Sequence, residues 1–269
     1  MIKQILLCIL GMFVFWGELN GETPEEIQTL RIAAVQGNVT AQITLSKAYI
    51  QGRWVEQNNA EAVKWMRLAA EQGDAGAQMN LGVAYEKGFG VEKDEMEAVK
   101  WYKLAAEKGD VKAQYNLGLA YLNGAGVETS YVEAIKLFQR AAQKGHPSAQ
   151  VNLGVMYERG LGVQKNNVEA VRWYRLAVLK GDSGAQQHLA YAFSVGQGVE
   201  KNDAEAVKYY LLSAKQGNSV AQYNLGVICE KGYGVQKNIN EAVKWYHLAA
   251  IQGNSAAQSH YERLKLQGY

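Results

Sequence analysis

Proline and cysteine are scarce in this sequence, with two residues of each among 269, and neither sign of charge dominates. So little proline beside 28 glycines, with 48% hydrophobic residues, excludes collagen-like and low-complexity chains and indicates an ordered chain that buries a core. The 28 Lys and Arg residues against 26 Asp and Glu leave a net charge of only +2, without the basic excess on which binding to nucleic acid depends. We therefore expect no nucleic-acid partner.

The first segment of the chain is an apolar run preceded by a single positive charge. Ile5 to Trp16 carries no charged residue and follows Lys3, a pattern typical of a signal peptide. As a helix this run rises about 18 Å, well short of the roughly 30 Å hydrocarbon core, so no lasting membrane span is expected. The sequence thus predicts that residues 1–21 are cleaved near Gly21 and that the protein is exported, either periplasmic or secreted. An uncleaved anchor is the alternative.

An internal repeat decides the fold. The dipeptide Ala-Gln recurs every 36 residues without insertion, at 41–42, 77–78, 113–114, 149–150, 185–186, 221–222 and 257–258. A fixed period of this length is the signature of a repeat architecture. The chain therefore divides into a half unit at 22–37, six full units at about 38–73, 74–109, 110–145, 146–181, 182–217 and 218–253, and a half unit at 254–269.

Each full unit predicts two helices joined by a tight turn. In the unit 74–109, Asp74 begins the first helix as an N-cap and Gly88 ends it. Asp94 begins the second helix, with Glu97 at the spacing of a capping box, in which each side chain bonds the backbone N–H of the other residue. The same box recurs at Asn58/Glu61, Ser130/Glu133, Asn166/Glu169, Asn202/Glu205 and Asn238/Glu241. The turn Gly-x-Gly-Val follows no strand and lacks a third glycine, which argues against a phosphate-binding loop.

The recurring residues Ala-Gln-x-Asn-Leu-Gly-x-x-Tyr-x-x-Gly-x-Gly-Val, then Glu-Ala-x-x-Trp-Tyr-x-x-Ala-Ala-x-x-Gly, resemble the SEL-one-like repeat family, which is related to the tetratricopeptide repeats. The resemblance covers residues 22–269 and implies an all-α fold, a right-handed α/α superhelix, or solenoid, of antiparallel helix pairs. It also implies adaptor or scaffold roles without naming a ligand. Some exported relatives carry a cysteine pair in each unit and this chain has none, so stacking between neighbouring units must stabilise it.

Cysteine content supports the same view. Cleavage of the signal peptide would remove Cys8 and leave Cys229 alone, which excludes an intrachain disulfide framework. Cys229 stands where the first four units carry tyrosine, and we interpret it as a small hydrophobe in a core position. A reactive thiol is the alternative.

The resemblance also implies where a partner would bind. In the tetratricopeptide arrangement the first helix of each unit lines the concave face, and the residue before its core leucine points into the groove. These residues are Thr44, Asn80, Asn116, Asn152, His188, Asn224 and His260. Helical spacing places beside them Met79, Val83, Tyr115, Leu119, Val151, Val155, Tyr191, Tyr223 and Val227. A ladder of Asn amides can bond successive peptide groups of an extended ligand; the alternative is that these amides have a structural role.

Motifs for catalysis or metal binding are lacking. The sequence contains no His-Glu-x-x-His, Cys-x-x-Cys, Gly-x-Ser-x-Gly or Ser-x-x-Lys, and its four histidines are dispersed. We therefore expect no catalytic residue, metal or cofactor, and a monomeric, exported, non-enzymatic scaffold that binds a partner protein or peptide on the concave face. The alternatives are a cell-wall or β-lactam hydrolase, by analogy with cysteine-rich relatives, and a purely structural spacer.

Overall fold

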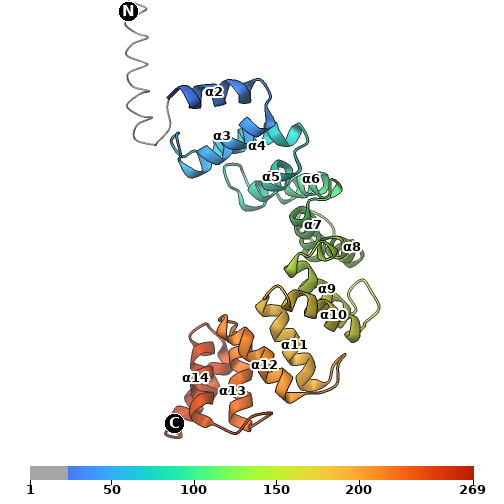
Figure 1. The fold of residues 1–269 in the computed structure, drawn as a ribbon, viewed down its shortest axis with the longest axis vertical. Coiled ribbons are helices and arrows are strands. Elements are labelled where there is room, and N and C mark those ends of the chain that lie inside the picture. Colours follow the sequence, from blue (N-terminus) through green and yellow to red (C-terminus); the bar gives the residue numbers. More distant parts are fainter. Residues whose placement is uncertain (1–23) are drawn as a thin grey trace, which may run out of the picture. The chain divides into compact units, whose positions relative to one another are not determined.

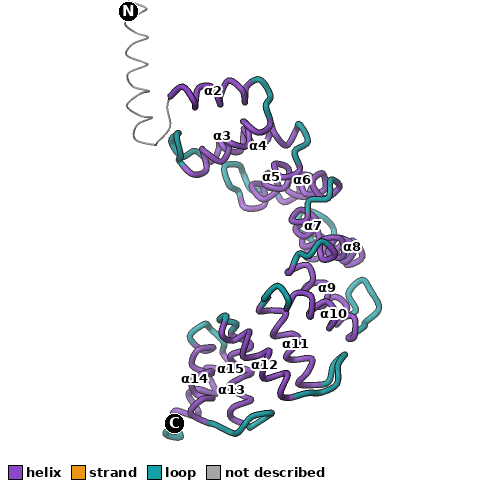
Figure 2. The backbone as a smooth tube through the Cα atoms, viewed as in Figure 1, coloured by secondary structure: helices purple, strands orange, loops and turns teal. Residues whose placement is uncertain are grey.

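The computed structural model describes residues 24–269, and these residues form fourteen helices joined by loops, without a strand (Figures 1 and 2). The predicted signal peptide at residues 1–21 lies outside the described residues. Among the helices that the structure describes, none combines the length and apolar character that crossing a membrane would require.

Two kinds of helix alternate along the chain. The first helix of each repeat, here called an A helix, is α3 (Val39–Gln51), α5 (Ala75–Lys87), α7 (Val111–Asn123), α9 (Pro147–Arg159), α11 (Ser183–Val195), α13 (Ser219–Lys231) and α15 (Ser255–Leu266). The second, or B helix, is α2 (Pro24–Val35), α4 (Asn59–Glu71), α6 (Glu95–Glu107), α8 (Tyr131–Gln143), α10 (Asn167–Val178), α12 (Asp203–Lys215) and α14 (Ile239–Ala250). The expected all-α solenoid of six helix pairs, with a half repeat at each end, is confirmed.

The described chain forms two compact units. The first contains α2 to α7 and ends at Ser130, and the second begins at Tyr131 and contains α8 to α15. Within each unit, the strongest contacts join helices that are consecutive in the sequence. Each unit is therefore a solenoid in which a helix is stabilised by the helices before and after it.

The Ala-Gln dipeptide joins each A helix to the B helix before it. The residue that precedes each A helix caps it, because its side chain accepts a hydrogen bond from the N–H of the alanine three residues on; the caps are Asn38, Asp74, Asp110, His146, Asp182, Asn218 and Asn254. The glutamine is buried in every A helix except α15, and in five repeats its Nε2 donates to a carbonyl near the end of the preceding B helix. Gln78, for example, bonds the Ala70 carbonyl at 3.0 Å. The dipeptide thus satisfies polar groups that two helix ends would leave unpaired.

The B helices begin with half of the expected capping box. The predicted cap side chains of α4, α6, α10, α12 and α14 each accept the N–H of the glutamate three residues on, as Asn58 does for Glu61 at 3.0 Å. The prediction of the reciprocal bond is wrong. The N–H of Asn58 donates to the Tyr49 carbonyl of the preceding A helix and not to the glutamate. The glutamate is left to pair with a basic residue one turn on, such as Lys64.

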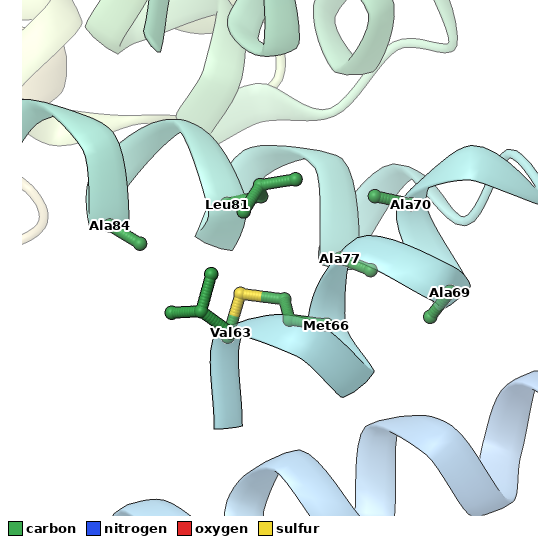
Figure 3. Close-up of a cluster of buried hydrophobic side chains, with 7 residues drawn as sticks. All are labelled: Val63, Met66, Ala69, Ala70, Ala77, Leu81 and Ala84. Atoms are coloured by element: carbon green, nitrogen blue, oxygen red, sulfur yellow. The ribbon is translucent and has the colours of Figure 1, made fainter. Parts of the chain in front are cut away.

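The core consists of small and aliphatic residues between neighbouring helices. Figure 3 shows one cluster, in which Val63 and Met66 of α4 face Leu81 of α5, with four alanines between the two helices. Leu81 is fully buried. Alanine lets consecutive helices approach closely, so burial is continuous along each unit.

Glycines fix the loop between the helices of a pair. Gly88 ends α5 with φ of 70°, and its N–H bonds the Ala84 carbonyl, as the sequence predicts for a left-handed C-cap. Two residues later Gly90, with φ of 68°, lies against the start of α4 in the preceding repeat. The loop therefore positions one repeat on the next.

Candidate binding groove on the A helices

Pockets recur on the face of the A helices that the sequence predicts to bind a partner. Each lies between two consecutive A helices and the B helix that separates them. In the first unit they have volumes of about 490 Å³ beside Asn80 and about 190 Å³ beside Asn116. In the second unit they have about 10 Å³ beside His188 and about 260 Å³ beside Asn224. Four of the predicted ladder residues thus line pockets.

The residues predicted to flank the ladder differ in solvent exposure. Leu119 lines the pocket of Asn116, and Tyr191 that of His188. Half-buried residues include Tyr115, Asn152, Val155 and Tyr223, of which Val155 packs against the core around Tyr174 and Tyr223 packs against Tyr246. Met79 is buried, so the structure places it in the packed interior rather than on the open wall of a groove.

A carboxylate and a phenol lie beneath the ladder in three repeats. The Tyr102 hydroxyl of α6 donates to Glu86 of α5 at 2.6 Å, and the same bond joins Tyr174 to Glu158 at 2.5 Å and Tyr246 to Glu230 at 2.8 Å. Burial and the carboxylate partner raise the pKa of each of these hydroxyls far above 10.0. These phenols therefore remain protonated donors.

The ladder residues are not equivalent, because some of them contact this buried layer. The Asn116 amide lies beside the Tyr102 hydroxyl, where it opposes the rise in the pKa of that group. His188 stacks on Tyr174 with ring centroids 4.8 Å apart and planes 12° apart. These two side chains have a structural role, whereas Asn80 is exposed at the mouth of its pocket.

A family model described as the Sel1 repeat matches six consecutive segments of the chain, residues 39–74, 75–110, 111–146, 147–182, 183–218 and 219–254. The chain belongs to the Sel1 repeat family. The six matches have the period and number of the repeats expected from the sequence, and the resemblance is confirmed.

Two solved Sel1 repeat structures are similar to this chain. One is c5321, described as a protective antigen present in uropathogenic Escherichia coli strains, with 38% identity and a TM-score of 0.83 over 97% of this chain. The match spans 56% of that protein's own length. The other is a Sel1 repeat protein from Oxalobacter formigenes, with 39% identity and a TM-score of 0.73, covering 80% of this chain and 86% of that one. None of the curated proteins matches the chain.

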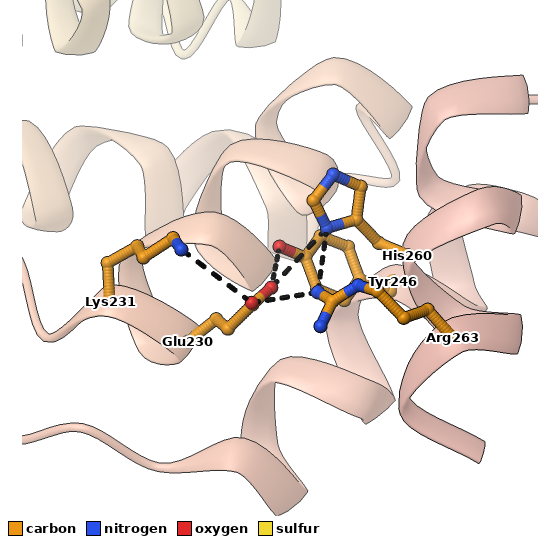
Figure 4. Close-up of polar contacts among 5 residues, drawn as sticks. All are labelled: Glu230, Lys231, Tyr246, His260 and Arg263. Atoms are coloured by element: carbon orange, nitrogen blue, oxygen red, sulfur yellow. Dashed lines mark hydrogen bonds and ion pairs between the residues drawn. The ribbon is translucent and has the colours of Figure 1, made fainter. Parts of the chain in front are cut away.

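The last Sel1 repeat contains a polar cluster around Glu230 (Figure 4). Arg263 of α15 donates to Glu230 of α13 at 2.7 Å, and His260 Nδ1 lies 3.4 Å from the same carboxylate. Burial opposes ionisation of Glu230, but hydrogen bonds from Tyr246 and Arg263 outweigh it and lower the pKa of the carboxyl. The terminal half repeat is thus attached to the last full repeat by a charged hydrogen bond as well as by packing.

The histidine and cysteine side chains of the described residues do not form a metal site. Between residues 24 and 269, no three His, Cys, Asp or Glu side chains gather where they could hold a metal ion. His188 and His260 share a repeat position, and each contacts a Tyr ring and a carboxylate. Cys229 packs against the core around Tyr246, and burial raises the pKa of its thiol. Cys229 is therefore half-buried at the edge of this core.

Protonation of His188 is expected to destabilise the second unit as the pH falls. Burial lowers the pKa of its imidazole below 6.5, although the Glu158 carboxylate, 3.8 Å from Nδ1, favours the charged form. Asp182 also favours the charged form and Arg159 opposes it. Because the unfolded chain then binds the proton more readily, the stabilisation is complete above about pH 6.5 and is lost as the pH falls through the folded pKa.

Melting temperatures of the wild type and of His188→Asn, measured between about pH 7.5 and about pH 5, test this. Asn is the residue that Asn116 supplies at the equivalent position, so the variant keeps a side chain that the repeat accommodates. The wild type should lose melting temperature more steeply than the variant. Parallel curves would contradict the assignment.

Sequence reasoning missed the Glu–Tyr pairs that lie beneath the ladder. Glu158 and Tyr174 lie on different helices, so only the packing of α9 against α10 brings the carboxylate to the hydroxyl. Comparison of the repeats with one another contains the signal. At these two positions glutamate occurs with tyrosine in three repeats, Leu122 occurs with Phe138, and Ile50 occurs with Met66, whereas Ser194 occurs with Tyr210.

Proposed function

We propose that this Sel1 repeat chain is a non-catalytic scaffold that binds a partner protein, with an extended segment of the partner lying along the A helices of a unit. One observation carries the proposal. Pockets recur between consecutive A helices, and the larger ones combine apolar walls with an amide from the same position of the A helix. Apolar pockets with a few placed polar groups are typical of peptide sites.

The amides of the second unit offer the chemistry of backbone recognition. Asn224 of α13 lines a pocket with Val227 and Tyr210, and Asn152 of α9 is half-buried at the equivalent position. An amide can donate to one peptide group and accept from the next, so it binds a segment without reading its side chains. Ion pairs such as Lys87 with Glu86 at 2.6 Å neutralise the charges beside the groove, which favours a partner without high charge.

Export is part of this proposal. It is supported by Lys3 and the apolar run from Ile5 to Trp16, and by similarity to a protein described as a protective antigen. The partner is therefore to be sought in the periplasmic and secreted fractions, and N-terminal sequencing of the protein recovered there reports whether the first segment has been removed.

The double variant Asn152→Ala/Asn224→Ala tests the groove. If the two amides bond the backbone of the partner, their loss leaves peptide groups unpaired at about 1–3 kcal/mol each, so affinity should fall at least about tenfold. Affinity is measured by titration calorimetry against the partner captured from the exported fractions. The melting temperature should stay close to that of the wild type, because these are partly open side chains.

Asn116→Ala is the matched control, because Asn116 occupies the same repeat position but lies against the buried Tyr102 hydroxyl. It should lower the melting temperature, in contrast to the double variant. Unchanged partner affinity in the double variant would reject the groove, and a loss of stability in it would assign these amides a structural role.

A further inference from the structure

The largest of the recurring pockets differs in chemistry from the others. It lies between α3 and α5 over α4 and has a volume of about 490 Å³. Where the next repeat places Glu86 and Tyr102, this repeat has Ile50 and Met66, so its floor carries neither acid nor phenol. Phe89 adds a half-buried aromatic wall. The pocket, here called the α3/α5 pocket, has the size and lining of a site for a large apolar group.

A buried hydroxyl in the pocket wall has no partner. Ser46 of α3 is 2% exposed, and its Oγ makes no hydrogen bond with the described residues. The equivalent residue of the next repeat is Gly82, against which Tyr102 packs. An unpaired buried hydroxyl costs free energy, which a ligand that bonds it would recover.

The rim of the pocket carries a cation that no described residue neutralises. Lys47 of α3 is exposed and pairs with none of the described residues, whereas Lys87 across the pocket is paired with Glu86 at 2.6 Å. Asp74 also lines the pocket, but its carboxylate accepts the N–H of Ala77 at the start of α5, where the helix dipole offsets its charge. The unpaired charge at this pocket is therefore positive.

We propose that the α3/α5 pocket selects, within the partner segment, a large apolar side chain next to an acidic residue. The apolar side chain lies on Ile50 and Met66, the acidic residue pairs with Lys47, and a peptide group of the segment bonds Ser46. This inference rests on the groove being the binding face, and it adds which side chains the first unit reads. Coulomb attraction beside an apolar wall is stronger than in bulk water, so the pair discriminates in favour of the acid.

Capped dipeptides test the pocket directly. N-acetyl-Asp-Phe-amide is titrated into the full chain labelled with ¹³C at its methionine methyl groups, because Met66 lines the pocket and Met156 lies buried in the second unit as an internal control. The Met66 signal should move to saturation while the Met156 signal stays in place. The Asn-Phe analogue should bind about three to five times more weakly, and the Asp-Ala analogue at least about ten times more weakly.

Two variants take their residues from the equivalent positions of the next repeat, which keeps them compatible with the fold. Lys47→Val introduces the residue that the next repeat carries as Val83. It should reduce affinity for the Asp-Phe probe to that for the Asn-Phe probe and leave affinity for the Asn-Phe probe unchanged. Ser46→Gly, after Gly82, should weaken both probes equally. Lys112→Val removes an exposed lysine of α7 that does not line the pocket, and it should change neither.

A Met66 signal that does not respond, or a preference for the acidic probe that survives Lys47→Val, would overturn the inference. Neither result bears on the groove proposal, which depends on Asn152 and Asn224 of the second unit.

Discussion

Replacing Tyr174 by alanine is expected to lower the free energy of unfolding of the second unit by about 3–5 kcal/mol. The side chain is 2% exposed, its ring packs on Gly154 and stacks on His188, and its hydroxyl donates to Glu158 at 2.5 Å. Alanine removes the whole ring from a site enclosed by two A helices, so a cavity remains and Glu158 loses its donor. Urea unfolding followed by circular dichroism measures the effect.

Two further variants separate packing from hydrogen bonding. Tyr174→Phe keeps the ring and should cost about 1–2 kcal/mol, because the half-buried Glu158 loses the bond from the hydroxyl. Adding Glu158→Leu reproduces the Leu122 and Phe138 that the preceding repeat carries at these positions, and it should recover most of that loss. If Tyr174→Ala costs no more than Tyr174→Phe, the ring does not stabilise the unit.

Gly90→Ala is expected to destabilise the first unit by about 3 kcal/mol or more, as the sum of backbone strain and overpacking. An added Cβ would lie 2.2 Å from the Asn59 carbonyl oxygen, and that carbonyl belongs to the backbone of α4 and cannot turn away. Either the loop or the start of α4 must move, which disturbs the stacking of one repeat on the next. The midpoint of urea unfolding reports the change.

Gly217→Ala is the matched control for Gly90→Ala. Gly217 also has a positive φ, 90°, but a Cβ there would meet nothing within 4 Å, so only the strain of about 1 kcal/mol is expected. Trp54 occupies the position of Gly90 in the first repeat with φ of 66°, so a side chain can adopt this backbone conformation. Equal losses in the two variants would show that φ, and not the contact with Asn59, requires glycine.

The helix pairs could be predicted from the sequence because the 36-residue period, the caps and the C-terminal glycines are local signals. The absence of the reciprocal capping bond could not be predicted from the sequence. The N–H of Asn58 bonds the Tyr49 carbonyl, which only the folded helix pair brings within reach. Local spacing predicts which backbone groups at a helix end need a hydrogen-bond partner. It does not state which neighbour satisfies them.

The positions of the candidate site residues could be predicted from the sequence, but the side chains that they contact could not. The resemblance to tetratricopeptide repeats implies that Asn80, Asn116, His188 and Asn224 share the concave face, and in the structure they line pockets. It cannot show that His188 stacks on Tyr174, because that contact crosses from one repeat to the next and depends on how closely the helices stack.

The contacts between consecutive helices in each unit also affect how the chain folds and how the number of repeats can change in evolution. Because helices pair with neighbours close in sequence, the contact order is low, and such topologies fold rapidly. A helix pair can begin to pack while the rest of the chain is still being synthesised. For the same reason, recombination that duplicates or deletes one 36-residue segment preserves the kind of interface at the new junction, so the length of the binding face can change without redesign of a distant core.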